Sequence, residues 1–162
     1  MIIKANIVIN SEMINLEEDL SLCIKNFSTT GRILEIGQRN SIKLFDIKGQ
    51  TMNIKSFKIP NFINRIAYKY FRKSKAQRSF EYASKLIDLH IGTPKPVAFY
   101  ESYDFVGLKK SYYACEHLAN VFEFRVVERN KDYPDAENIL RQFTRFTFEM
   151  HQKGIEFLDH SP

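Results

Sequence analysis

The order of the predicted elements places this chain in the α+β class. Three β-like runs, RILEI, SIKLF and TMNIKSF, follow one another closely and are joined by glycine-bearing turns at 37–40 and 46–50. Short glycine-containing turns between such runs are typical of antiparallel hairpins. Helical spacing of apolar residues then dominates 60–90 and 139–150. Because strands and helices are segregated rather than alternating, a doubly wound sheet is not expected.

The first thirty residues add a strand and a helix to this plan. The run IIKANIVI alternates and predicts a short strand. Asn15 followed by Glu18 resembles a capping box, in which the two side chains satisfy the first free N–H groups of a helix. Apolar residues at helical spacing between 16 and 27 then indicate that a helix follows.

The central segment 60–75 is predicted to form a basic amphipathic helix. Its apolar side contains Phe62, Ile63, Ile66, Tyr70 and Phe71. Its other side contains Arg65, Lys69, Arg72, Lys73 and Lys75. A second helix follows and ends at HIGTPKP, where glycine and prolines stop helices. Two further strands, VAFYE and KSYYACEHL, complete the sheet, and a last core-facing helix covers 139–150.

Composition limits the class of partner and the compartment. The chain has 162 residues and a net charge of +5, which favours an anionic partner. Cys23 and Cys115 lie far apart without a CxxC or metal-binding spacing, so we expect two reduced thiols in a cytoplasmic protein. The N-terminus lacks a signal-peptide core, and no run approaches the ~18 apolar residues of a membrane-spanning helix.

Three strands, a helix that carries an acid, and two strands that end in a polar linker form the layout of a kinase N-lobe. The run KSFKIPNFINRIAYKYFRKSKAQRSFEYASKLIDLHIGTPKP resembles bacterial lipopolysaccharide core kinases, the Kdo and heptose kinases. MHQKGIEFLDHSP looks like the end of a helix that enters their catalytic loop. The resemblance covers about residues 32–162 and lies in the order and spacing of weak motifs rather than in one strong motif.

The resemblance implies a protein-kinase-like N-lobe over 1–118 and the start of a helical C-lobe over 119–162. The N-lobe would hold an antiparallel sheet of about five strands plus helices, with an extra strand and helix at 1–30. The chain ends at Pro162, inside the predicted catalytic loop. We therefore expect a truncated C-lobe that contributes its first helix, and a 162-residue chain that is inactive by itself.

The same resemblance implies roles for three charged residues and implies ATP and Mg²⁺ as cofactors. Lys55 would contact the α- and β-phosphates of ATP, and Glu81 would pair with Lys55 to hold it there. Asp159 would orient the acceptor hydroxyl and accept its proton. The family's metal-binding asparagine would lie beyond Pro162, so no metal ligand is predicted within the chain.

Two further segments are matched to the nucleotide by the resemblance. The turn GQRN, which includes Gly37, Arg39 and Asn40, corresponds to the turn that covers the phosphates, although it holds a single glycine. Glu116 and His117 correspond to the hinge, where backbone groups would bind adenine.

Each candidate also has a purely structural interpretation. Lys55 could be a solvated strand lysine, since Lys43, Lys48 and Lys58 are nearby and equally basic. Glu81 lies four residues before Lys85, a spacing that suits an ordinary surface ion pair on a helix.

The resulting hypothesis is an ATP-dependent kinase that acts on a Kdo or heptose hydroxyl of the lipopolysaccharide inner core. The expected partners are a nucleotide, a lipid-linked sugar or other anionic acceptor, and an anionic membrane surface contacted through 60–75 at the cytoplasmic side of the inner membrane. One alternative is a kinase-like phosphotransferase with another acceptor. The other is a non-catalytic basic domain, although no nucleic-acid partner is expected because the sequence lacks an RNP, KH or finger motif.

Overall fold

The computed structural model describes residues 4–59, 61–130 and 132–156. The chain divides into two compact units, Met1–His117 and Leu118–Pro162. Within the described residues, no helix combines the length and the hydropathy needed to cross a membrane.

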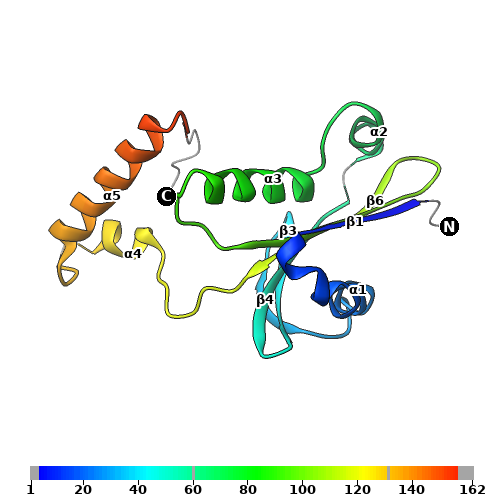
Figure 1. Cartoon of the computed structure of the whole chain (residues 1–162), viewed down its shortest axis with the longest axis horizontal. Coiled ribbons are helices and arrows are strands. Elements are labelled where there is room, and N and C mark those ends of the chain that lie inside the picture. The colour runs from blue at the N-terminus through cyan, green and yellow to red at the C-terminus, as the bar shows by residue number, and fades with distance from the viewer. Residues whose placement is uncertain (1–3, 60, 131, 157–162) are drawn as a thin grey trace. The chain divides into compact units, whose positions relative to one another are not determined.

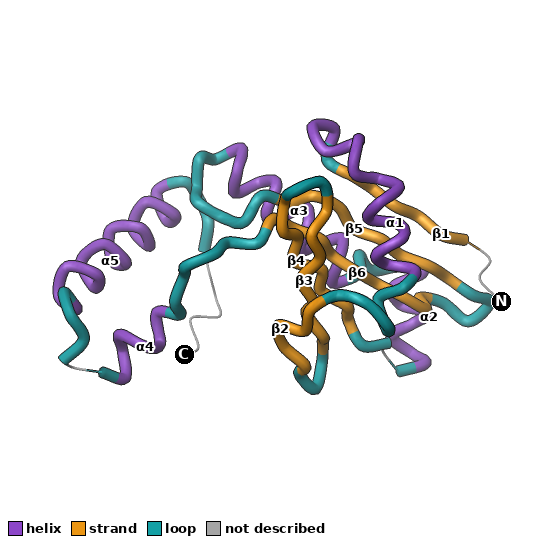
Figure 2. The backbone as a smooth tube through the Cα atoms, turned by 90° about the horizontal axis from the view of Figure 1, so that it is seen from below, coloured by secondary structure: helices purple, strands orange, loops and turns teal. Residues whose placement is uncertain are grey.

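Unit 1 is built on one antiparallel sheet of six strands in the order β1-β5-β6-β4-β3-β2 (Figure 2). The strands are β1 Lys4–Ile9, β2 Arg32–Ile36, β3 Asn40–Ile47, β4 Gln50–Phe57, β5 Pro96–Tyr103 and β6 Leu108–Glu116. β2, β3 and β4 form the predicted meander, and β6 and β5 continue the sheet from β4. The predicted extra strand is present as β1, which pairs with β5 at the edge opposite β2. The α+β class is confirmed.

Helices cover both faces of this sheet (Figure 1). The helices of unit 1 are η1 Ser11–Leu16, α1 Glu17–Lys25, α2 Phe62–Tyr70 and α3 Lys75–Asp88. α1 lies on one face and α3 on the other. α1 precedes the meander along the chain, and α3 belongs to the connection between β4 and β5.

The face under α1 is a dry apolar core. Leu20 of α1 and Met52 and Ile54 of β4 have no exposed surface. The ring of Phe27 contacts the rings of Phe45 and Tyr112, with centroids 6.0 and 5.3 Å apart. Burial of this apolar surface is the main stabilising contribution on this face of the sheet.

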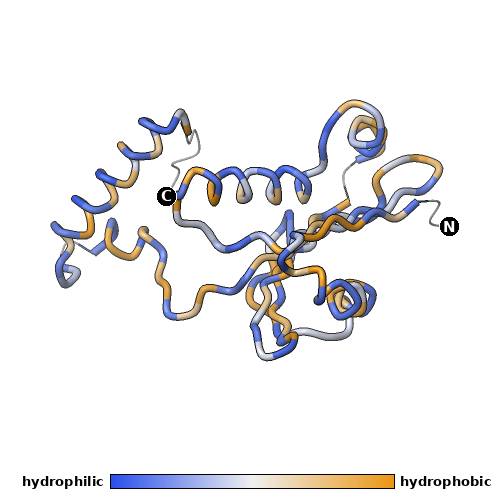
Figure 3. Tube along the Cα trace, viewed as in Figure 1, coloured by the Kyte–Doolittle hydropathy of each residue, from blue (hydrophilic) through white to orange (hydrophobic). Residues whose placement is uncertain are grey.

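The face under α3 contains more polar side chains. Phe80 of α3 packs on Phe99 of β5 with ring centroids 5.5 Å apart. Beside this contact, the buried hydroxyls of Ser74 and Ser111 lie 3.4 Å apart. The carboxyl group of Glu101 is also buried on this side of the sheet. In Figure 3, α3 alternates between hydrophilic and hydrophobic residues, as a helix with one face on a sheet does.

The helix starts depend on local side chains, and one predicted start was wrong. The capping box expected at Asn15 does not form, because Asn15 lies inside the 3₁₀ turn η1, and α1 begins directly after that turn. Asn10 caps η1 instead, by accepting a hydrogen bond from the N–H of Glu12 at 3.1 Å. Asn61 and Ser74 cap α2 and α3 in the same way.

Unit 2 contains α4 Phe124–Arg129 and α5 Ala136–Gln152. α5 covers the helix predicted at 139–150, whereas α4 was not anticipated. The rings of Phe124 and Phe143 stack with centroids 4.2 Å apart and fix α4 against α5. Phe148 of α5 is 60% exposed in this unit.

Candidate functional site

Lys55 lies near the middle of the sheet, on a central strand. It belongs to β4, between Ile42 of β3 and Tyr113 of β6. Strand side chains alternate between faces, and Ile54 points into the core under α1. Lys55 therefore lies on the face that α3 covers, in line with Tyr113 and Phe99. The side chain is half-buried, and its Nζ lies 5.6 Å from the centroid of the Phe57 ring.

Two of the competing lysines are held by structural contacts. Lys43 Nζ donates hydrogen bonds to the carbonyl oxygens of Phe27 at 2.6 Å and Thr30 at 2.8 Å. Lys48 Nζ donates to the carbonyl oxygen of Asn15 at 2.6 Å and lies 3.3 Å from an Asp19 carboxylate oxygen. In the described part of the chain, no hydrogen bond or ion pair holds Lys55 Nζ. The structure therefore leaves the Lys55 ammonium group available on the α3 face.

Glu81 lies on α3, but its carboxylate contacts other partners than Lys55. Lys73 Nζ donates to its two oxygens at 2.8 and 2.9 Å, and Gln77 Nε2 donates at 3.0 Å. The hydrogen bond from Lys73 is the main cause that lowers the pKa of Glu81. Neither the predicted pair with Lys55 nor the local pair with Lys85 is formed among the described residues. The role of Glu81 beside Lys55 stays a prediction.

The turn between β2 and β3 is tied to the end of β4. Gly37 N–H donates to the Asn40 carbonyl oxygen at 2.9 Å and closes the turn. Lys58 N–H donates to the Arg39 carbonyl oxygen at 3.1 Å. The structure thus places the predicted phosphate-covering turn beside the C-terminal end of β4, a few residues past Lys55.

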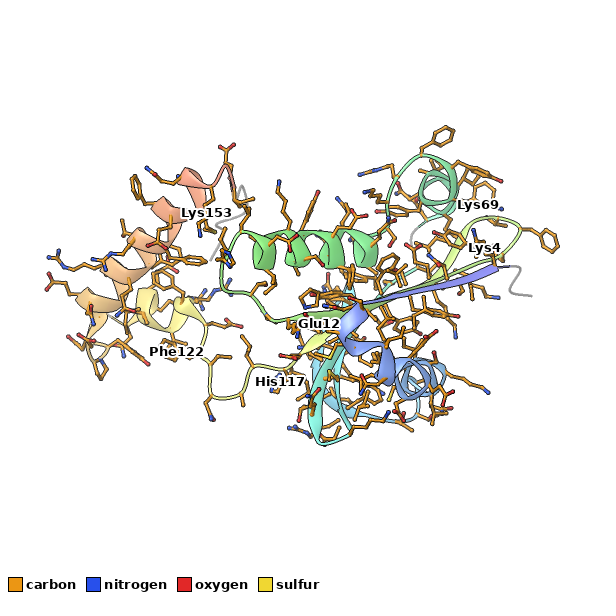
Figure 4. All side chains as sticks on the ribbon, in the orientation of Figure 1. Lys4, Glu12, Lys69, His117, Phe122 and Lys153 are labelled. Carbon is orange, nitrogen blue, oxygen red and sulfur yellow. The ribbon has the colours of Figure 1, made fainter. Side chains whose placement is uncertain are left out.

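The predicted hinge residues lie at the end of β6, where the chain leaves unit 1 (Figure 4). Glu116 N–H donates to the carbonyl oxygen of Lys95 at 3.0 Å, and His117 N–H donates to that of Thr51 at 2.9 Å. Because both donors are used within the fold, an adenine at this segment would have to use other backbone groups.

The described residues include neither the predicted catalytic acid nor a cluster of metal ligands. Asp159 lies outside the described residues. Within the described ranges, His, Cys, Asp and Glu side chains form no group of three or more that could hold a metal ion. Any Mg²⁺ that the resemblance implies would therefore need ligands from other residues or from the nucleotide phosphates.

Glu101 is a buried acid that the sequence interpretation missed. It is 4% exposed and lies opposite Ser111 in the ladder between β5 and β6. Its Oε2 accepts a hydrogen bond from the Tyr103 hydroxyl at 2.8 Å, whereas Oε1 has no hydrogen-bond partner. Burial, followed by this contact with Glu101, raises the pKa of Tyr103. The signal in the sequence was an acid within the strand-like run AFYESY.

These elements define the class of fold. β2, β3, β4, α3, β5 and β6 follow in the order predicted for a kinase-like N-lobe, with a lysine on the third strand of that series. Unit 1 therefore has the fold of a kinase-like N-lobe.

The comparison with solved structures gives one particular likeness. The chain is similar to a structure of WaaP in complex with acyl carrier protein, with a TM-score of 0.52 and 14% sequence identity over 80% of this chain. The match covers 48% of the WaaP chain, so this chain spans about half of its length. At this identity, the likeness shows a shared fold. No family model and no curated protein matches the sequence.

Proposed function

We propose that unit 1 is the nucleotide-binding lobe of an ATP-dependent kinase that phosphorylates a sugar hydroxyl, Kdo or heptose, of the lipopolysaccharide inner core. The observation that carries this proposal is the position of Lys55 on β4, where among the described residues its ammonium group lies over the Phe57 ring but forms no hydrogen bond or ion pair. The resemblance of the surrounding sequence to lipopolysaccharide core kinases and the fold shared with WaaP support it.

The chemistry of phosphoryl transfer explains why such a lysine matters. The transferred group carries several negative charges, so catalysis consists mainly of positioning and charge neutralisation. Lys55 would bind the phosphates from the α3 face, and the Gly37–Asn40 turn would cover them. A bound Mg²⁺ would supply further positive charge. Asp159 would orient the acceptor hydroxyl and accept its proton.

The direct test replaces Lys55 by Met in the protein as it occurs in its source cells. We expect phosphorylation of an acceptor with Kdo and heptose to fall by at least about a hundredfold. Lys25→Met is the matched control, because it removes an exposed lysine of α1 that lies outside the proposed sites, and it should retain most activity. Full activity in Lys55→Met would contradict the assignment.

The identity of the acceptor needs an experiment of its own. A screen with labelled ATP should compare inner-core sugars, small alcohols, antibiotics and proteins. Label on the sugars alone would support a core kinase, and label on another acceptor would identify a different phosphotransferase. Salt-dependent binding of random RNA that ATP does not change would instead indicate a non-catalytic basic domain.

The segment 60–75 carries the proposed contact with an anionic membrane. In α2 and the residue that follows it, Phe62, Ile63 and Phe71 are 63%, 76% and 84% exposed. Lysines and arginines lie on the same segment, including Lys69, which is labelled in Figure 4. Exposed aromatic residues beside cations suit the interface of an anionic bilayer.

Vesicle sedimentation tests this contact. We expect binding to vesicles with phosphatidylglycerol but not to vesicles of phosphatidylcholine alone, and weaker binding after Phe62→Ser with Phe71→Ser. Phe148→Ser is the control, because Phe148 is equally exposed but lies in unit 2. Equal binding by both variants would contradict a contact through 60–75.

A further inference from the structure

A small cavity opens in unit 1 where five segments meet. It has a volume of about 290 Å³. Its walls come from the β2–β3 turn, the end of β4, α2, the start of α3 and the start of β6. Lys55 does not line it.

The charge of this cavity is entirely of one sign. Five of its lining residues are cations, Arg39, Lys58, Lys75, Lys109 and Lys110, although strand alternation places the Lys110 side chain on the other face of the sheet, with Tyr112. Its lining contains no acid, and none of these cations forms an ion pair with an acid in the described part of the chain. Nearby cations differ, because Arg65 is paired with Asp104 and Lys73 with Glu81. The positive charge at the cavity is therefore uncompensated.

Apolar side chains between these cations strengthen the electric field inside the cavity. Phe57, Tyr68 and the buried Leu108 contribute apolar surface, which focuses the field of charges at its edge. The amide of Asn64 adds a neutral hydrogen-bond donor, whereas the Ser111 hydroxyl already donates to Ser74. Such a combination suits an anion that carries a small organic group.

The cavity is also held in place before any ligand binds. Arg65 of α2 donates from Nε to the Leu108 carbonyl oxygen at 3.0 Å and from Nη2 to both Asp104 carboxylate oxygens, at 2.7 and 2.6 Å. α2 approaches the β5–β6 turn so closely that a Cβ at Gly107 would lie 2.3 Å from the Arg65 carbonyl oxygen. These contacts fix the α2 wall against the β6 wall, and a preorganised site loses less entropy on binding.

We propose that this cavity binds a phosphate ester at a second site, which lies next to the proposed nucleotide site and shares the Gly37–Asn40 turn with it but not Lys55. A phosphate group carries up to two negative charges and several acceptor oxygens, which several lysines and an arginine can satisfy together. The volume is at the small end of ligand pockets, so it suits a phosphate with a small organic group rather than a whole nucleotide. The proposal holds whether or not unit 1 binds ATP.

Calorimetry with the 162-residue chain and glycerol 3-phosphate as the probe tests the site. Lys75→Gln with Lys109→Gln removes two of these cations. Lys25→Gln with Lys85→Gln is the matched control, since it removes the same charge from exposed helix positions outside the cavity. We expect the first variant to bind at least about tenfold more weakly and the control to change less than about twofold. Lys109→Arg should retain binding because it keeps the charge.

Vesicles of phosphatidylcholine with and without phosphatidic acid distinguish the source of the phosphate. Binding of free glycerol 3-phosphate indicates a soluble ester, whereas binding of phosphatidic acid vesicles alone indicates a lipid headgroup. Either result supports the site if Lys75→Gln with Lys109→Gln weakens it at least about tenfold. Three results overturn it: binding of neither probe, equal weakening in the matched control, or equal weakening by Lys55→Met, which would make the cavity part of the nucleotide site.

Discussion

Lys43 and Lys55 lie on neighbouring strands but on opposite faces of the same sheet, and their ammonium groups have different contacts. On the face under α1, Lys43 is held by the carbonyl oxygens of Phe27 and Thr30. On the face under α3, no comparable contact holds Lys55 in the described residues. The first face is closed by apolar packing, whereas the second combines apolar contacts with polar groups and with an ammonium group that has no hydrogen bond or ion pair among the described residues. The difference predicts that the contacts of the first face contribute more to stability.

Ile54→Ala should have the largest effect on stability, because it opens a cavity on the closed face. Ile54 has no exposed surface and packs under α1. We expect the free energy of unfolding to fall by about 2–5 kcal/mol. Urea unfolding followed by circular dichroism measures it. Asn53→Ala, one residue away on the other face, should cost less than about 1 kcal/mol. A larger loss for Asn53→Ala than for Ile54→Ala would reverse the comparison.

Lys43→Met should have an intermediate effect. The change removes an ammonium group that satisfies carbonyl oxygens at the end of α1 and lies 5.1 Å from the centroid of the Phe27 ring. Hydrogen bonds from charged groups contribute about 1.5–3 kcal/mol, so we expect a loss in that range. The same urea measurement checks it. An unchanged midpoint would show that water replaces the lysine without cost.

Lys55→Met should leave the free energy of unfolding nearly unchanged, in contrast to the changes on the face under α1. Its Nζ contacts the ring of Phe57 but holds no backbone group. We expect a change within about 0.5 kcal/mol in the urea measurement. Nucleotide binding, measured by calorimetry with ATP, should be lost in Lys55→Met and retained in Lys43→Met. The opposite result would assign the nucleotide to the face under α1.

The sheet could be predicted from the sequence because its signals are local. Alternation in TMNIKSF, with turns on both sides, gives β4 and also separates Ile54 from Lys55. Glycine at position 49 suits the tight β3–β4 turn, where its φ is +80°. About five antiparallel strands were predicted from such patterns together with the order of elements, and the extra N-terminal strand joins them as the sixth.

The partners of individual side chains could not be predicted in the same way. The carbonyl groups that hold Lys43 lie 13 and 16 residues before it, and become available only because α1 ends there. Glu81 pairs with Lys73, eight residues earlier. The pair can form because Ser74 caps α3, so Lys73 lies directly before the first turn of the helix. Both contacts depend on where helices end, and helix ends are the least certain part of a sequence-based prediction.

The reactivity of the two cysteines tests the difference between the two faces without a mutation, because the reactivity of a thiol depends on its burial. Cys115 of β6 lies opposite Asn53 and is buried, and burial raises the pKa of its thiol to about 11. Cys23 of α1 is half-buried, and its pKa is also raised, mainly by burial. Because folding favours both neutral thiols, their stabilising contribution is complete below the ordinary pKa of 9.0 and for Cys115 is lost as the pH rises through about 11.

Iodoacetamide labelling followed by mass spectrometry measures these thiols. At pH 8, about one Cys115 side chain in a thousand would be a thiolate, so we expect Cys23 to be alkylated first. The rate at Cys115 should rise about tenfold per pH unit until the pH nears its pKa. ATP should slow Cys115 further if the nucleotide lies on the Lys55 face, and should leave Cys23 unchanged. Slowing at Cys23 alone would place the nucleotide on the α1 face, and equal initial rates would show that β6 is less closed than its packing implies.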